Sequence, residues 1–389
     1  MSESRPLLAC LALLAACDAA PSPPRSPRLR VRDALRGASL ADDAGFARAD
    51  RVRAFEFPAD HGPHPEFRSE WWYVTGNLAG ADGRRFGFHV TFFRNALAPG
   101  AIAAATASPW RTHQLWMAHF ALSDVQRGRM HAAERFARGA LDLAGARAVP
   151  FAVHVEDWSL ASLGVDFAPL RLRAKDGAVE VDLELVVERG VVLQGEDGLS
   201  RKGEREGNAS YYYSVPRLRV TGRVSDLGGD PIEVAGTAWL DREWSTSALD
   251  ERQLGWDWFA LQLDEPASGP LELMLYRLRR DDGSSDPASA GCLVGERLAR
   301  TPLSLADFSL EALRFATSPR SAARYPVEWR VRVPAQGLDL HVSPVLDDQE
   351  LDLAFRYWEG AVDVRGTRNG VPLTGRGYLE MTGYADSER

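Results

Sequence analysis

Short strand-like runs bounded by turn residues recur along this 389-residue chain from about residue 51 to its end. The runs EWWYVTGNL (70–78) and RRFGFHVTFFR (84–94) flank the turn segment AGADG, an arrangement typical of a β-hairpin. Few segments show the 3.6-residue period of a helix, so the pattern predicts an all-β fold. Roughly sixteen or more such runs exceed what one sandwich or small barrel needs. We therefore expect two consecutive antiparallel β-barrel domains, over residues 51–215 and 216–389, divided near YYYSVPRL.

The charge balance limits the class of partner. The chain carries 46 Lys and Arg residues against 54 Asp and Glu residues, which gives a net charge of -8 at pH 7. A protein that binds nucleic acid needs a basic surface to neutralise phosphates, so nucleic acid is not an expected partner. We expect a monomer.

The N-terminal segment PLLACLALLAACDAAPSPP has an apolar run, then small residues and Cys17. The run is too short to span a bilayer and has the form of a signal-peptide apolar region. Its LAAC ending resembles a bacterial lipobox, in which the cysteine becomes the acylated first residue of the mature protein. The resemblance implies a signal peptide over 1–17, a lipid anchor at Cys17, a flexible tether over 18–50 and a location at the periplasmic face of a membrane. Asp18 leaves the inner and outer membranes both open, and an ordinary cleaved signal is the alternative.

The cysteines agree with this interpretation. Cys10 would leave with the signal peptide and Cys17 would be acylated, so only Cys292 remains in the mature chain. A single cysteine cannot form an internal disulfide, and packing alone must stabilise both domains.

Alternation along the strand 237–245, TAWLDREWS, separates its polar residues onto two faces. Asp241 and Glu243 point one way together with Trp239, whereas Arg242 and Trp244 point the other way. Residues i and i+2 lie about 6–7 Å apart along a strand, so the two carboxylates can reach one cavity.

Two further runs show the same separation. In RRFGFHVTFFR, His89 lies on a mixed face, opposite the apolar face that carries Phe88 and its alternate neighbours, and a mixed face of this kind is typical of a ligand-lined barrel interior. In GWDWFALQLD (255–264), Trp256 and Trp258 share a face that is opposed by Asp257.

The segment DHGPHPEFRSEWWY (60–73) combines two histidines and three carboxylates with three consecutive aromatic residues. We expect the stretch from His61 to Glu70 to form a polar rim that leads into the wall of the first barrel. In the alternative interpretation, Glu70 and Arg94 pair across the hairpin and His61 bonds a backbone carbonyl. The spacing of His61, His64 and Glu66 suits a metal, but the intervening prolines break any regular element, which favours a hydrogen-bonded loop and no metal.

Several segments between about residues 54 and 384 match segments of a known protein family and follow one another in the same order. They are DHGPHPEFRSEWWYVTGNL, FGFHVTFFR, HFALSD, EDWS, LQGEDGLSRKG, NASYYYS, WLDREWS, GWDWFALQL and YWEGAV. The chain thereby resembles the secreted AttH-type proteins, relatives of carotenoid 1,2-hydratase that are often labelled predicted secreted hydrolases. The resemblance implies two consecutive lipocalin-like β-barrels.

The hydratase branch of that family implies a mechanism without metal or cofactor. An acid protonates a carbon–carbon double bond, aromatic faces hold the tertiary cation, and water adds to it. One departure argues against carotenoid hydration itself: the carotenoid hydratases carry a histidine just before the tryptophan in this region, whereas this chain has DREW, which places Arg242 nearby, and a guanidinium does not shuttle protons. The expected catalytic residues are Asp241, Glu243, Asp257 and Tyr276. The expected ligand-binding residues are His61, His64, Glu70, Trp72, His89, Arg94, His119, Trp239, Arg242, Trp244, Trp256 and Trp258.

Three functions remain open at this level. The first is a cofactor-independent enzyme, a hydro-lyase acting on an isoprenoid-like or lipid ligand. The second is a non-catalytic carrier of a hydrophobic ligand, and the third is a hydrolase that uses Asp241 and Glu243 as a carboxylate pair. The sequence has no G-x-S-x-G elbow, no H-E-x-x-H and no phosphate-binding glycine loop, so an ordinary serine hydrolase is unsupported.

Several residues also have a purely structural interpretation. The charged residues of DREW can pair with one another in a buried ion network. The aromatic runs WWY and YYY can simply be core residues. His119 is then a core histidine, and Lys202 is a solvated loop charge.

The anchor can be tested directly. Cys17→Ala should convert a detergent-extracted protein into one that is released to the aqueous fraction or left unprocessed, because the acylated residue is gone. Fractionation and N-terminal mass measure this, and no change in either would exclude the anchor.

Overall fold

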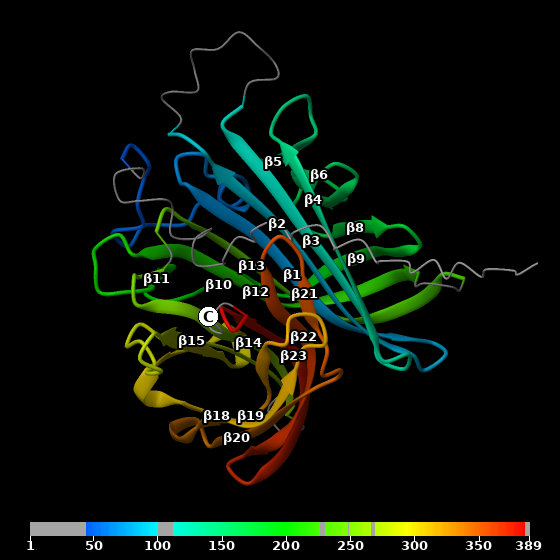
Figure 1. Ribbon diagram of the computed structural model, residues 1–389, viewed down its shortest axis with the longest axis vertical. Coiled ribbons are helices and arrows are strands. Elements are labelled where there is room, and N and C mark those ends of the chain that lie inside the picture. Colours follow the sequence, from blue (N-terminus) through cyan, green and yellow to red (C-terminus); the bar gives the residue numbers. More distant parts are fainter. Residues whose placement is uncertain (1–43, 100–111, 226–229, 248, 266–268, 386–389) are drawn as a thin grey trace, which may run out of the picture.

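The computed structural model describes residues 44–99, 112–225, 230–247, 249–265 and 269–385. The fold is all-β, as expected, and these residues form no α-helix, only four short 3-10 turns. Two large antiparallel sheets each curl into a barrel-like domain (Figure 1). No helix in the described ranges has the length and apolarity to cross a membrane. The signal peptide, Cys17 and the tether up to residue 43 lie outside the described residues.

The first sheet contains thirteen strands. Its path is β4-β3-β2-β1-β13-β12-β9-β8-β7-β6-β5, and β10 and β11 pair with β12. The strands are β1 (Ser69–Gly80), β2 (Arg85–Ala96), β3 (Gln114–Asp124), β4 (Arg129–Arg138), β5 (Ala144–Ala148), β6 (Phe151–Val155), β7 (Trp158–Ser162), β8 (Leu170–Asp176), β9 (Val179–Arg189), β10 (Val192–Leu193), β11 (Leu199–Arg201), β12 (Ala209–Ser225) and β13 (Ile232–Ser245).

The second sheet contains ten strands on the path β17-β16-β15-β14-β23-β22-β20-β19-β18, with β21 paired to β22. The 3-10 turns are η1 (Ala59–His61), η2 (Glu296–Leu298), η3 (Leu305–Asp307) and η4 (Pro334–Gln336). The strands are β14 (Gln253–Glu265), β15 (Gly269–Arg280), β16 (Ala290–Val294), β17 (Arg300–Ser304), β18 (Ser309–Thr317), β19 (Arg324–Val333), β20 (Leu338–Pro344), β21 (Glu350–Asp352), β22 (Arg356–Arg368) and β23 (Val371–Thr382).

The boundary expected near Val215 is wrong for the sheets. Strands β12 and β13 both belong to the first sheet, so the sheets divide between Ser245 and Gln253. The misleading signal was Pro216, which lies inside β12 where the pairing with β13 shifts register between Val215 and Leu218. A proline without an N–H is accommodated at such a bulge, and the strand continues past it.

The start of the first domain also lies earlier than expected. The tether was expected to extend to residue 50, but Phe46 and Ala49 are buried against the barrel. The backbone N–H of Ala47 donates to the carbonyl of Glu66 at 2.9 Å, which fixes this segment along the barrel end.

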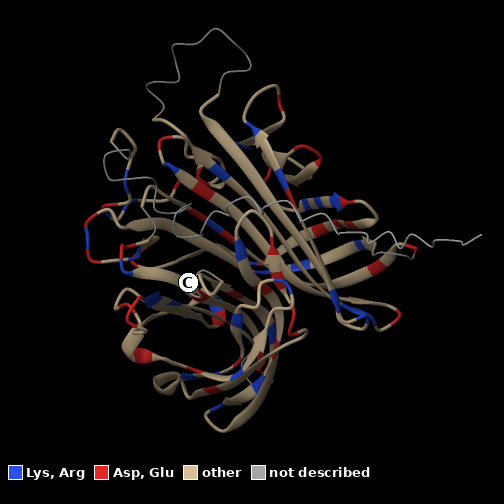
Figure 2. Cartoon of the chain, viewed as in Figure 1, with Lys and Arg blue, Asp and Glu red and all other residues tan. Residues whose placement is uncertain are grey.

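Strand alternation builds a separate core in each barrel. The face of β2 that carries Phe86, Phe88, Val90 and Phe92 packs into the first core. The expectation that the mixed face with His89 lines the barrel interior is wrong, because that face lies toward Tyr357 of the second sheet. A third apolar cluster lies between the two sheets and includes Tyr73 of β1 and Trp258 of β14. Blue and red residues are interspersed over both sheets in Figure 2, so neither domain forms a single-sign surface in that view. The contact between the sheets thus contains this aromatic cluster together with ion pairs such as Arg85–Asp363, and a cavity opens within it.

Candidate functional site

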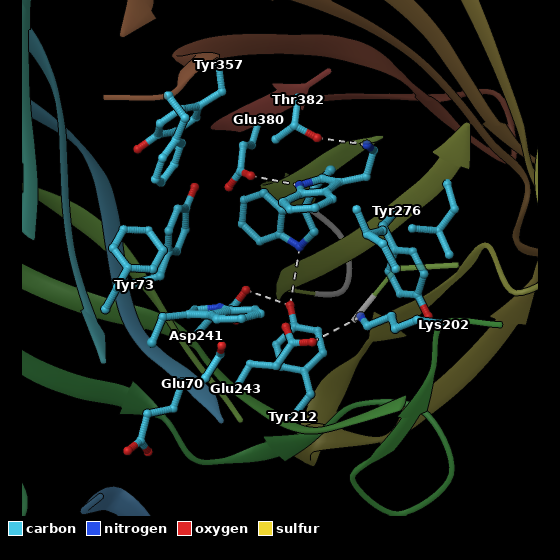
Figure 3. A pocket seen from close by; sticks show the side chains of 18 of the residues that line it. Glu70, Tyr73, Lys202, Tyr212, Asp241, Glu243, Tyr276, Tyr357, Glu380 and Thr382 are labelled. Atoms are coloured by element: carbon cyan, nitrogen blue, oxygen red, sulfur yellow. Dashed lines mark hydrogen bonds and ion pairs between the residues drawn. The ribbon is translucent and has the colours of Figure 1, made fainter. Parts of the chain in front are cut away.

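A cavity of about 130 Å³ lies between the two sheets. Its outer residues, including Trp71, Phe93 and Phe355, are half-buried, whereas Asp241 and Tyr212 at the inner end are almost fully buried. The walls come from both sheets (Figure 3) and consist of Ser69, Glu70, Trp71, Tyr73, Phe93, Asn95, Met117, Lys202, Tyr212, Asp241, Glu243, Leu249, Trp256, Trp258, Tyr276, Leu278, Phe355, Tyr357, Glu380 and Thr382.

Asp241 is the buried acid that the sequence predicts on β13. Its Oδ1 accepts hydrogen bonds from the Ser214 hydroxyl at 2.5 Å and the Trp239 indole N–H at 2.7 Å. Its Oδ2 accepts from the Tyr212 hydroxyl at 2.6 Å. Burial raises the pKa of Asp241 to about 7, against the lowering effect of these donors, and the charge of Glu243 adds to the rise. A proton is therefore available on this carboxyl near neutral pH.

Glu243 shares the cavity with Asp241, as alternation predicts, but has different partners. Its Oε1 accepts from the Ser210 hydroxyl and lies 3.2 Å from the Nζ atom of Lys202. Lys202 is only 8% exposed, so the expectation of a solvated loop charge is wrong. Burial lowers the pKa of Lys202, but Glu243 and Tyr276 more than offset this and raise it above its ordinary value. Lys202 is thus a charged residue of the cavity.

The second sheet carries a further pair of buried carboxyl groups that the sequence pattern did not predict, and one of them, Glu380, lies in the cavity wall. Glu359 of β22 and Glu380 of β23 are direct cross-strand partners. Tyr73 donates to Glu359 at 2.7 Å, and the Trp256 indole N–H donates to Glu380 at 2.7 Å. Burial raises the pKa of Glu380 to about 7 and that of Glu359 well above its ordinary range. Two like carboxyls in one buried place share a proton rather than both ionising.

Aromatic rings separate these two acidic walls. Tyr73 and Trp258 meet edge to face with their ring centroids 5.2 Å apart. The Trp258 indole N–H donates to the Tyr212 hydroxyl at 3.3 Å, and the Lys202 ammonium lies 4.2 Å from the Tyr276 ring centroid. The electron-rich faces of such rings attract cations.

Of the expected catalytic residues, three line the cavity and one does not. Asp241, Glu243 and Tyr276 are in its wall. Asp257 points to the other face of β14, where it accepts from Arg277 at 2.6 Å and from the Tyr384 hydroxyl at 2.8 Å. Strand alternation already placed Asp257 on the face opposite Trp256 and Trp258, which line the cavity. Asp257 therefore lies outside the cavity.

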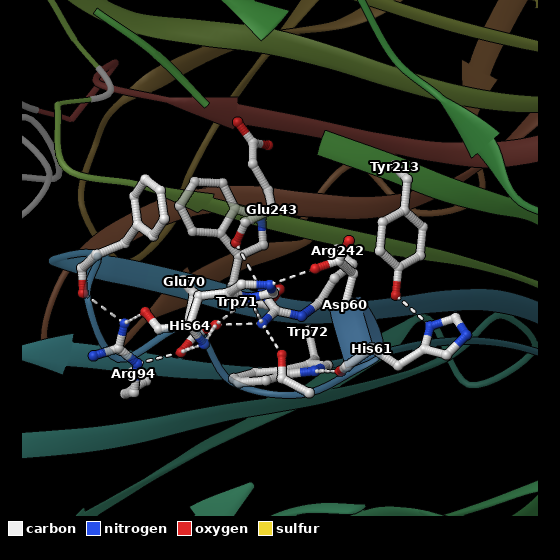
Figure 4. A network of polar contacts seen from close by, with 12 residues as sticks. Asp60, His61, His64, Glu70, Trp71, Trp72, Arg94, Tyr213, Arg242 and Glu243 are labelled. Atoms are coloured by element: carbon white, nitrogen blue, oxygen red, sulfur yellow. Dashed lines mark hydrogen bonds and ion pairs between the residues drawn. The ribbon is translucent and has the colours of Figure 1, made fainter. Parts of the chain in front are cut away.

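A second group of expected site residues forms a buried ion network at one end of the first barrel (Figure 4). Glu70 pairs with Arg94 of β2 and with Arg242 of β13, and neither the carboxylate nor Arg242 has exposed side-chain area. Burial opposes ionisation, but Arg242 and Arg94 hold the pKa of Glu70 well below its usual range. The Arg242 guanidinium also lies 3.9 Å from the centroid of Trp72.

The histidines of this group are parts of the same network. His64 contacts Asp60 at 3.0 Å and Arg242 at 3.1 Å and stacks on Trp244 at 3.8 Å. His61 bonds the Tyr213 hydroxyl at 2.6 Å rather than a backbone carbonyl, and burial lowers its pKa to about 3. Among the described residues, no group of three or more His, Cys, Asp or Glu side chains could hold a metal ion.

The polar rim expected from His61 to Glu70 is therefore wrong, and the alternative of a Glu70–Arg94 pair across the hairpin describes the geometry. Although Glu70 borders the cavity, its carboxylate points away from it (Figure 3). Trp72, Arg94, Arg242 and Trp244 lie on the barrel side of the strands as well.

His89 and His119 occupy a third location, the contact between the first sheet and β22. His119 bonds the Tyr357 hydroxyl at 2.7 Å, and His89 bonds Thr91 at 2.6 Å. Burial lowers both pKa values, that of His119 to about 3, so both rings are neutral. Since Tyr357 lines the cavity, His119 orients a wall residue without lining the cavity itself.

Comparison with known proteins agrees with this architecture. A family model described as AttH-like matches residues 48–384. A crystal structure described as an AttH from Nitrosomonas europaea is 38% identical, has a TM-score of 0.75, and the match covers 87% of this chain and all of that one. No curated protein matches this chain with significant similarity.

Two more distant structures share the fold. Kievitone hydratase from Nectria haematococca is 15% identical with a TM-score of 0.66, and the match covers 89% of this chain and 98% of that one. CghA, solved with Sch210972, is 12% identical with a TM-score of 0.54, and the match covers 91% and 99% of the two chains.

The ion network predicts a stability effect. Glu70→Gln should reduce the free energy of unfolding by about 3–5 kcal/mol, because two arginines lose their buried partner. Chemical denaturation measures this. The matched control is Glu233→Gln, which breaks a pair with Arg223 that is 67% exposed on both sides, and it should cost much less because solvent screens the pair. Equal losses in the two variants would contradict the assignment.

Asp241 should titrate far above an ordinary aspartate. In carboxyl-carbon NMR, one resonance that is absent in Asp241→Asn should titrate near pH 7. Titration of that resonance below about pH 4, the ordinary value, would show that the carboxyl is ionised and paired instead.

Proposed function

This chain belongs to the AttH-like family, and from that premise we propose that it is a hydratase-like enzyme acting on a hydrophobic, unsaturated ligand in the cavity between its sheets. The observation that carries the proposal is Asp241, a carboxyl with a pKa raised to about 7 at the inner end of an aromatic cavity. An acid that keeps its proton at neutral pH beside π-surfaces is what protonation of an alkene requires.

The first step is proton transfer through Tyr212. The Trp258 N–H can only donate, so the Tyr212 oxygen accepts it. When protonated Asp241 donates to the same oxygen, the Tyr212 O–H is released toward the cavity. Tyr212 then gives its proton to one alkene carbon while it receives the proton of Asp241. The C=C π bond becomes a C–H bond and a neighbouring carbocation, and Asp241 becomes a carboxylate.

The carbocation forms beside the aromatic walls. Trp256, Trp258 and Tyr73 supply ring faces in a site that excludes most water, where cation–π attraction reaches about 2 kcal/mol or more. The carboxylate left on Asp241 adds an opposite charge close to the cation. These two features stabilise charge where it develops.

Water then adds to the cation. A C–O bond forms, and the second proton of the water goes to a carboxylate, for which Glu380 on the opposite wall is suited by its pKa of about 7. The acid and the acceptor exchange protonation states in each turnover, and proton exchange with solvent restores the starting state. The alkene and one water thus become an alcohol with no cofactor.

The relatives support this class of reaction without identifying the ligand. Kievitone hydratase, which has the same fold, carries a hydratase activity in its name. At 15% identity the likeness itself concerns the fold, so the argument for this chain rests on its own cavity. Anchoring through Cys17 at the periplasmic face of a membrane, which would bring the cavity near apolar substrates, is part of the proposal.

A non-catalytic carrier is the second candidate, because aromatic walls also suit a bound hydrophobic ligand. A carrier would not need Asp241 with a raised pKa, since a buried ionisable group weakens an apolar site. A carboxylate-pair hydrolase is less suited, because its substrate needs an open polar cleft and this cavity is small and aromatic.

Activity should depend on both carboxyl walls. With a panel of isoprenoid alkenes in ¹⁸O-labelled water, mass spectrometry should detect an alcohol that contains the label. Asp241→Asn should lower the rate by about 10²–10⁴-fold, the range of general acid catalysis. The rate should be highest near pH 7, because higher pH deprotonates Asp241 and lower pH protonates Glu380.

Folding provides the control for this variant. The folded-state pKa of Asp241 lies above its ordinary 3.8, so the free energy of unfolding falls as pH rises from about 4 to about 7. Asp241→Asn removes that cost, and its melting temperature above pH 7 should equal or exceed that of the parent. Unchanged turnover in a folded Asp241→Asn protein would refute the acid, and ligand binding without any turnover would favour the carrier.

A further inference from the structure

The inner end of the cavity holds an ion pair that the proposed reaction does not use. Lys202 and Glu243 lie 3.2 Å apart beside the rings of Tyr212 and Tyr276 (Figure 3). Asp241, Tyr212 and Glu380 suffice for proton transfer. Burying a further ammonium and carboxylate costs several kcal/mol, so their presence in this cavity needs an explanation.

The Lys202 loop is fixed rather than free to fold back into solvent. The backbone N–H of Lys202 donates to the carbonyl of Asn208 at 2.8 Å, and its carbonyl accepts from the Gln253 side chain at 2.6 Å. The ammonium therefore stays over the Tyr276 ring, 4.2 Å from its centroid.

The ion pair leaves N–H groups of Lys202 and the Oε2 atom of Glu243 without a hydrogen bond among the described residues. Glu243 Oε1 takes both the Ser210 hydroxyl and the Lys202 ammonium, while in the described part of the chain no hydrogen bond reaches Oε2. An ammonium has three N–H donors, and the oxygen contact to Glu243 accounts for one of them. The ammonium also lies 5.2 Å from the ring centroid of Tyr212 and 4.2 Å from that of Tyr276.

A hydroxyl group matches this arrangement, because it accepts through its oxygen and donates its hydrogen. We propose that Lys202 and Glu243 form a hydroxyl-recognition subsite, so that the ligand is an oxygen-bearing unsaturated molecule rather than a pure hydrocarbon. Lys202 donates to the ligand oxygen, and Glu243 Oε2 accepts the ligand proton. The double bond then lies toward Tyr212 and the indole rings.

The dimensions of the cavity define the size of the recognised group. A cavity of about 150 Å³ in another protein binds benzene, and the cavity here is about 130 Å³. One ring or one short branched chain carrying a hydroxyl fills the inner end. A hydrocarbon of the same shape would leave the buried pair without its third partner and would bind more weakly.

A binding experiment tests the subsite with p-cresol and toluene, which differ only by the hydroxyl. Titrations followed by protein NMR should give a dissociation constant for p-cresol at least about tenfold lower than that for toluene, as expected for hydrogen bonds to charged groups. In Lys202→Met the ratio should fall to about one. In Lys175→Met, the matched control, it should persist, since Lys175 is the other lysine of the chain and its side chain is 56% exposed.

Two outcomes would overturn the subsite. One is equal affinity for the two compounds, or no p-cresol binding up to its solubility limit. The other is a p-cresol preference that survives in Lys202→Met. If that variant does not fold because Glu243 is left unpaired, the double variant Lys202→Met/Glu243→Met removes both charges and both hydrogen-bonding groups, and it must also lose the preference.

The subsite rests on the proposed function for its meaning, but its test does not require turnover. Asp241→Asn, which should lower the hydration rate by about 10²–10⁴-fold, should keep the p-cresol preference. In the unmodified protein, a p-cresol preference without any hydration would refute only the hydratase proposal, and hydration without the preference would refute only the subsite.

Discussion

Alternation of side chains along β13 is the constraint on which both polar systems of this protein depend. The strand pairs with β1 on one side and β12 on the other, so it lies in the middle of the first sheet. Because successive side chains leave opposite faces, Arg242 enters the barrel while Asp241 and Glu243 enter the space between the sheets. Two buried charged systems thus lie back to back across a single layer of backbone.

The two systems differ in how completely their charges are paired. Inside the barrel, Glu70 meets two arginines, and its pKa falls well below its usual range. Between the sheets, Asp241 receives only neutral donors, and burial wins, which raises its pKa to about 7. Similar burial therefore produces a permanent charge in one place and a transferable proton in the other. The first arrangement holds the barrel end together, and the second suits chemistry.

The contact between the sheets turns separate acids into one site. Asp241 comes from the first sheet and Glu380 from the second, and aromatic rings of both sheets fill the space between them. Hydrogen bonds cross this contact, as from Tyr73 to Glu359. Neither domain alone would bury these carboxyls, so the raised pKa values are a property of the assembled pair of domains.

The sequence by itself determined what depends on neighbouring residues. The period of two gave the all-β class, the common face of Asp241 and Glu243, and the opposite direction of Arg242, because a strand fixes the relation of i to i+1 and i+2. The segments that resemble the AttH-type proteins predicted the two-barrel architecture.

Only the tertiary structure decided which distant residues meet. It assigned β12 and β13 to the first sheet, because Pro216 sits at a bulge instead of ending the strand. It also buried Lys202 and placed Glu380, with its cross-strand partner Glu359, in the wall contributed by the second sheet. These partners are far apart along the chain; Tyr73 and Glu359, for example, are separated by 286 residues. The local sequence pattern cannot predict which residues pair over such a separation. Burial and charge partners set a pKa, so the chemistry of the site is fixed only when the two sheets close on each other.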